Sequence, residues 1–182
     1  MADGASRAFE LVGDYPSSAF RRDGAVCVRG AFSAAEVELV ASGIERNLAS
    51  RSPRAIIASR PDDPGRFFED FCNRRDIPEY EAFVRTSPAA AIAGRLMGSE
   101  RVRLFHDHVL VKEPGTRQRT PWHQDQPYYN VDGTQACSMW MPVDPVSRES
   151  TPEFVAGRTS GRGSCRARSW TSRRSGSPKE AW

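Results

Sequence analysis

The residues of this chain best suited to chemistry lie at positions 122–125, which read Trp-His-Gln-Asp. On an extended backbone successive side chains alternate between two faces, so His123 and Asp125 project to the same side. One imidazole and one carboxylate supply two of the three ligands of a facial iron site, which keeps three positions open for oxygen activation. The alternative is a chance His-x-Asp in a polar loop, because a short motif gains meaning only from its context.

Two flanking stretches supply such a context. Residues 106–115 read His-Asp-His-Val-Leu-Val-Lys-Glu-Pro-Gly, and residues 136–144 read Ala-Cys-Ser-Met-Trp-Met-Pro-Val-Asp. Together with the central motif they resemble the core of the phytanoyl-CoA dioxygenase family, over about residues 20–157 and most specifically over 104–157. The resemblance implies an oxygenase that depends on iron(II) and 2-oxoglutarate and is built on a double-stranded β-helix.

The resemblance also implies roles for individual residues. His123 and Asp125 bind the iron, and no catalytic residue is expected beyond these metal ligands. Trp140 lies close to the 2-oxoglutarate pocket, with ordinary core packing as the alternative. His106 and His108 share one face of an expected strand, where we expect them to line the barrel interior and hydrogen-bond locally, with a role as metal ligands as the alternative. His108 is also a candidate for contact with the cofactor or the substrate.

The predicted strands that would position these residues lie mainly in the second half of the chain. Alternating or short apolar runs indicate strands at residues 25–28, 101–112, 122–125, 136–143 and 153–155. Three prolines interrupt residues 51–76, so we expect mostly loop there, with aromatic packing by Phe67, Phe68 and Phe71. The predicted fold class is mainly β with N-terminal helices, an incomplete double-stranded β-helix or jelly roll.

Local signals also predict the helices that brace this sheet. Ser33 and Glu36 form a capping box, and apolar residues recur at helical spacing after them. Ser87 and Pro88 are suited to begin another helix, and Gly98 is suited to end it. These features, with a helical pattern after Pro78, predict helices over residues 34–49, 78–84 and 89–97. Residues 1–19 are expected to form a loose leader.

Length and composition limit the class of protein. A chain of 182 residues is long enough for one domain. No apolar run approaches membrane-spanning length, and the first ten residues have no signal core. Four cysteines without C-x-x-C spacing indicate neither a zinc site nor a disulfide framework. We therefore expect a cytoplasmic protein that uses dioxygen and a small-molecule substrate and has no membrane association.

The character of the sequence changes after Gly157. There the family continues with a Ser-His pair that carries the second metal histidine, and later with an arginine for the cofactor's far carboxylate. Here the last 25 residues contain no Val, Ile, Leu, Met or Phe, and they hold seven basic residues against one acidic residue. We predict a partial domain over residues 1–157 and a disordered basic tail over 158–182. An altered reading frame explains this composition better than a nucleic-acid-binding arm, so a nucleic-acid partner is not expected.

These observations predict an iron(II)- and 2-oxoglutarate-dependent dioxygenase that hydroxylates a small organic substrate. The chain has three histidines and none after His123, so we expect impaired activity. One alternative is an inactive metal-binding pseudo-enzyme. A nucleic-acid-associated protein that acts through its basic tail is less favoured.

Overall fold

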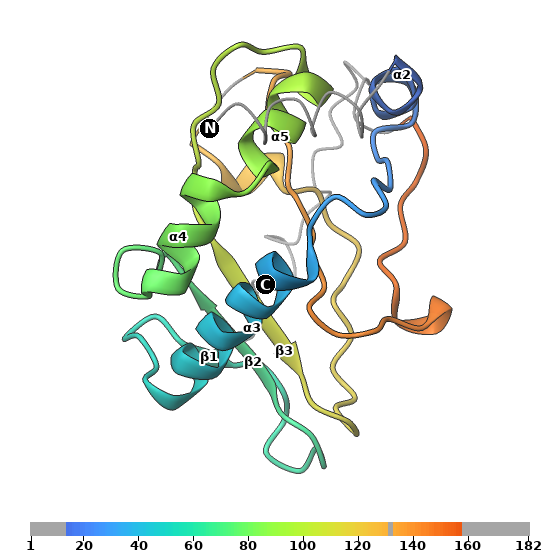
Figure 1. Ribbon diagram of the computed structural model, residues 1–182. Coiled ribbons are helices and arrows are strands. Elements are labelled where there is room, and N and C mark those ends of the chain that lie inside the picture. The colour runs from blue at the N-terminus through green and yellow to red at the C-terminus, as the bar shows by residue number, and fades with distance from the viewer. Residues whose placement is uncertain (1–13, 131–132, 158–182) are drawn as a thin grey trace.

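The computed structural model describes residues 14–130 and 133–157 (Figure 1). Its helices and strands are, in chain order, α2 (Asp14–Asp23), α3 (Ala34–Ala49), β1 (Ile56–Ile57), β2 (Phe67–Phe71), α4 (Pro78–Thr86), α5 (Ala89–Met97) and β3 (His108–Lys112). Two short 3-10 helices follow, η1 (Gln126–Tyr128) and η2 (Arg148–Ser150). No helix in the described part of the chain is long and apolar enough to cross a membrane.

The three strands form one antiparallel sheet with β2 in the centre, and α3 lies across one of its faces (Figure 1). Phe68 is paired with Val111 and Phe71 with His108. Alternation along β2 therefore turns Phe68 toward the helices, where it is buried with Tyr80 and other apolar side chains. Burial of one such phenylalanine contributes about 2 kcal/mol to stability. The opposite face of the sheet carries Phe71 and His108.

A second apolar cluster packs α2 against α5. Ile92 and Leu96 of α5 are buried there, and Phe20 of α2 packs against them. The amide of Gly157 donates to the carbonyl of Asp23 at 2.9 Å, so the segment after β3 returns to α2. That segment, yellow to orange in Figure 1, contains no strand in its described residues.

A buried carboxylate connects α3 to the sheet. Asp70 is fully buried and accepts hydrogen bonds from Asn47 Nδ2 at 2.9 Å and from the amide and hydroxyl of Ser52 at 3.0 and 2.6 Å. Burial raises the pKa of Asp70, but hydrogen bonds from Ser52, Asn73 and Asn47 outweigh it and lower the pKa to about 2. Asp107 lies between His106 and His108 in the sequence. Its carboxylate accepts a hydrogen bond from the backbone amide of Asn73 at 2.9 Å. This network therefore sets the position of the histidine-bearing strand.

The helix predictions are confirmed, with one change of detail. α3 begins after Ser33, and the predicted capping box with Glu36 is present. Gly98 ends α5 in the left-handed region, with φ of +64°. Pro88 rather than Ser87 precedes α5, because Ser87 already ends α4.

The predicted leader is wrong where the structure describes it. Residues 14–23 form α2, which is held in place by the burial of Ala19 and by the packing of Phe20 on α5. Residues 1–13 lie outside the described part. The predicted tail over 158–182 lies outside it too, and both stay predictions.

Most strand predictions are wrong in the described residues. β2 occupies residues 67–71, where a loop was expected, and β3 covers only the last five residues of the predicted strand 101–112. A strand exists only where another strand pairs with it, so apolar alternation alone was insufficient to predict strands. The predicted strands with no partner are residues 25–28, 122–125, 136–143 and 153–155. The chain thus forms a small antiparallel sheet with helices, and these residues hold more helix than strand.

Candidate metal site

The structure brings His123 and Asp125 together. His123 Nε2 lies 3.2 Å from Asp125 Oδ1, and both side chains are a little less than half exposed. The sequence predicted a strand for these two residues, and this prediction is wrong. Instead the chain bends at Asp125 into η1, and this bend turns the carboxylate toward the imidazole.

The hydrogen bonding of His123 defines which ring nitrogen is available to a ligand. Nδ1 lies 2.8 Å from the carbonyl oxygen of Pro121. A carbonyl oxygen only accepts hydrogen bonds, so Nδ1 carries a hydrogen, and in the neutral form of the ring Nε2 is a bare acceptor. In that form Nε2 and Asp125 Oδ1 are two acceptors that face each other, an arrangement that a bound cation stabilises.

The distance between these two atoms also fits a metal ion. Two ligand atoms with bonds of about 2.1 Å that meet at a right angle lie about 3 Å apart. The observed 3.2 Å is close to this value. An imidazole nitrogen and a carboxylate oxygen are moreover the donor types of the two-histidine, one-carboxylate iron sites. The residues present therefore fit an iron ion, with two protein ligands.

The second carboxylate oxygen of Asp125 is occupied by protein. Ser138 Oγ donates a short hydrogen bond to Asp125 Oδ2, and Tyr129 Oη lies 3.0 Å from the same Ser138 oxygen. The sequence did not single out Ser138 or Tyr129 for such a role. The available signal was that Ser138 shares the face of Trp140 in the predicted strand 136–143.

The other two histidines belong to β3 and to the segment before it, and the charge of Asp125 acts on His108, where it opposes the lowering of the pKa by burial. The ring of His106 contacts the rings of Phe105 and Tyr129, with centroids 5.2 and 5.8 Å apart, and lies 6.3 Å from the ring of His108. No group of three His, Cys, Asp or Glu side chains in residues 14–130 and 133–157 is placed to hold a metal ion. His106 and His108 therefore do not complete a triad with His123 and Asp125 in this arrangement.

His108 has a neighbour that sequence reasoning missed. Glu69 of β2 is 4% exposed, and its Oε2 lies 3.9 Å from His108 Nε2. Burial raises the pKa of Glu69, opposed by the charge of Lys112, and burial lowers the pKa of His108. The signal available in the sequence for this neighbour was the acidic Glu69 inside the aromatic run 67–71.

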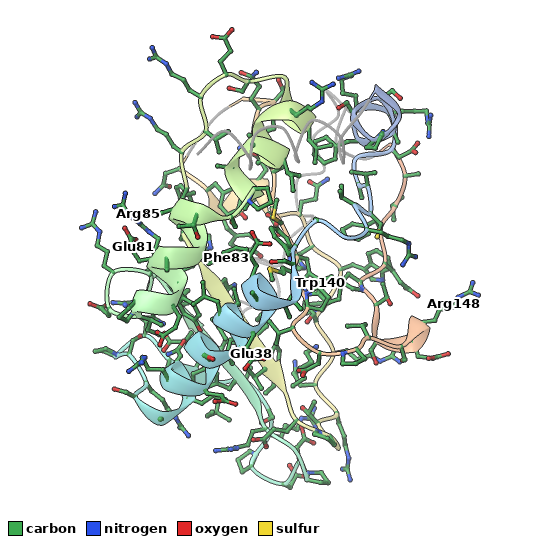
Figure 2. All side chains as sticks on the ribbon, in the orientation of Figure 1. Glu38, Glu81, Phe83, Arg85, Trp140 and Arg148 are labelled. Atoms are coloured by element: carbon green, nitrogen blue, oxygen red, sulfur yellow. The ribbon has the colours of Figure 1, made fainter. Side chains whose placement is uncertain are left out.

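Trp140 lies on the extended segment after η1, apart from α4 and α5, and about half of it is exposed (Figure 2). Figure 2 also shows Arg148 of η2 at the outer edge of this segment. The predicted place of Trp140 beside the cofactor stays a prediction.

The candidate site lies within a stretch that is similar to a known family. The family model described as phytanoyl-CoA dioxygenase (PhyH) matches residues 20–157. The matched range contains His123, Asp125, Ser138 and both other histidines. No curated protein and no solved structure matches the chain.

Proposed function

The chain belongs to the phytanoyl-CoA dioxygenase family, and on this premise we propose that His123 and Asp125 bind iron(II) in an oxygenase centre that uses 2-oxoglutarate. The observation that carries the proposal is the separation of 3.2 Å between His123 Nε2 and Asp125 Oδ1, inside the matched range. The small sheet is proposed to be part of the double-stranded β-helix expected for the family.

Iron and 2-oxoglutarate together supply the oxidation of a substrate C–H bond by dioxygen, with succinate and carbon dioxide as products of the cofactor. The chain's own residues supply ligands and orientation. Pro121 fixes the tautomer of His123, so that Nε2 faces the metal position. Asp125 contributes one negative charge, which offsets part of the charge of the metal ion. We propose that His108 and Trp140 face the cofactor.

The same geometry favours impaired turnover. A facial triad has three protein ligands, and the described residues offer two. The charge of Glu69, when ionised, also repels an anionic cofactor from the sheet face beside His108. We therefore expect weak iron binding and little turnover by this chain. An inactive metal-binding pseudo-enzyme is the second candidate, and the absence of a three-ligand group in the described residues favours it.

An anaerobic titration of the full chain with iron(II), with and without 2-oxoglutarate, tests the proposal. We expect one weakly bound iron per chain and at least a tenfold loss of affinity in His123→Ala and in Asp125→Ala. Asp144→Ala removes an exposed carboxylate from the same segment and should bind iron as the wild type does. Equal affinity in all four proteins would refute the proposed site.

A further inference from the structure

The two oxygens of the Asp125 carboxylate have different surroundings. Oδ1 faces His123 Nε2 at 3.2 Å, whereas Oδ2 accepts the hydroxyl hydrogen of Ser138. A serine hydroxyl has a single hydrogen to donate, and a carboxylate only accepts. Because that hydrogen is used on Asp125, the hydrogen in the 3.0 Å contact between Tyr129 Oη and Ser138 Oγ comes from Tyr129, whose hydroxyl also interacts with the Asp125 carboxylate. The three side chains therefore form a directed chain from Tyr129 through Ser138 to Asp125.

Tyr129, where this series of hydrogen bonds begins, is held in place by packing. The ring of Tyr129 lies 5.0 Å from the ring of Phe105 and 5.8 Å from that of His106, between centroids. Both partners belong to the segment that leads into β3, whose position is set by the buried network around Asp107. The orientation of the Asp125 carboxylate is therefore tied to the sheet and not only to its own loop.

The hydrogen bonds from Tyr129 through Ser138 to Asp125 restrict rotation of the Asp125 carboxylate. An unrestrained aspartate can turn to present both oxygens to a metal ion, which takes up a second coordination position. A facial centre requires its remaining positions for the cofactor and for dioxygen. A hydrogen bond that occupies Oδ2 keeps this oxygen away from the metal and leaves Oδ1 as the ligand atom.

We propose that Ser138, itself oriented by Tyr129, is a positioning residue that makes Asp125 a one-oxygen ligand through Oδ1. The inference rests on the proposed metal site of His123 and Asp125. It goes beyond that site by assigning the choice of ligand oxygen to a serine thirteen positions after Asp125 in the sequence.

Cobalt(II) is a suitable probe, because its visible absorption bands weaken as the coordination number rises. We would titrate the full chain and its Ser138→Ala, Ser138→Thr and Tyr129→Phe variants with cobalt(II). Ser138→Ala should bind the ion about tenfold more weakly and with weaker bands, and Ser138→Thr, which keeps the hydroxyl, should restore both. Tyr129→Phe should change both in the same direction and by less. Thr134→Ala, which removes an exposed hydroxyl from the same segment, should match the wild type.

The outcomes separate this inference from the proposed function. If Ser138→Ala keeps the wild-type affinity and spectrum while His123→Ala loses binding, the positioning role is refuted and the metal site stands. If His123→Ala and Asp125→Ala also bind cobalt as the wild type does, the metal site itself is refuted. If Ser138→Thr fails to restore the spectrum although its thermal unfolding matches the wild type, the hydroxyl has no positioning role.

Discussion

The carboxylate of Glu69 lies 3.9 Å from the imidazole of His108, on the face of the sheet that the helices leave uncovered. This distance is too long for a hydrogen bond. Burial disfavours the charged form of both groups, because it raises the pKa of Glu69 and, together with nearby His106, lowers that of His108. Burial therefore favours the neutral form of both side chains.

Glu69→Gln is expected to raise the free energy of unfolding at neutral pH, since the amide carries no charge to bury. The pKa of Glu69 is higher in the folded state than its ordinary value of 4.5. Its contribution to stability is therefore fully present below that value and is lost as the pH rises through the folded pKa. Urea unfolding at several pH values should show the advantage of the variant fade in acid. Exposed Glu153→Gln is the control, and an advantage that grows in acid would contradict the expectation.

Asp70→Asn should have the opposite pH dependence. The pKa of Asp70 is lowered from 3.8 to about 2, so its contribution is present above 3.8 and is lost as the pH falls toward about 2. We expect the variant to lose about 2 kcal/mol at neutral pH and to approach the wild type in acid. Chemical unfolding across this range measures the difference, with the exposed Asp62→Asn as control. A loss that is independent of pH would show that the charge of Asp70 is not its source.

Gly43→Ala tests the packing of α3 on α4. Alanine normally stabilises a helix interior by about 1 kcal/mol relative to glycine. Here a Cβ at position 43 would lie 2.5 Å from Tyr80 Cε1, and Tyr80 is buried. We expect a net loss of about 1 to 3 kcal/mol, because the overpacked side chain must move. Ser42→Ala, on the same helix, is the control in thermal unfolding, and a stabilised Gly43→Ala would contradict the packing described here.

The sequence predicted those parts of the fold that depend on neighbouring residues. The capping box of Ser33 and the glycine end at Gly98 act within one helical turn, and both helices lie where they were expected. β2 was missed because the prolines of residues 51–76 indicated a loop. The buried Asp70 of this strand depends on Asn47 and Ser52, which are distant in sequence.

The candidate site was predictable to the same extent. The sequence paired His123 with Asp125 on an expected strand, whereas the structure brings them together through a bend at Asp125. The contact of Ser138 with Asp125 needs the chain to reverse after η1, and the contact of Glu69 with His108 needs the register of β2 and β3. Strand pairing and chain reversal depend on the whole fold, so the sequence pattern did not reveal these partners.

The central claim is that His123 and Asp125 form an iron centre for which the described residues offer no third protein ligand. The most direct test is succinate release from 2-oxoglutarate by the full chain, supplied with iron(II) and dioxygen and compared with His123→Ala and Asp125→Ala. We predict succinate at or near the background rate in all three proteins, although only the wild type binds iron. Robust, iron-dependent succinate release by the wild type would contradict the claim, and its loss in His106→Ala or His108→Ala would then identify the third ligand.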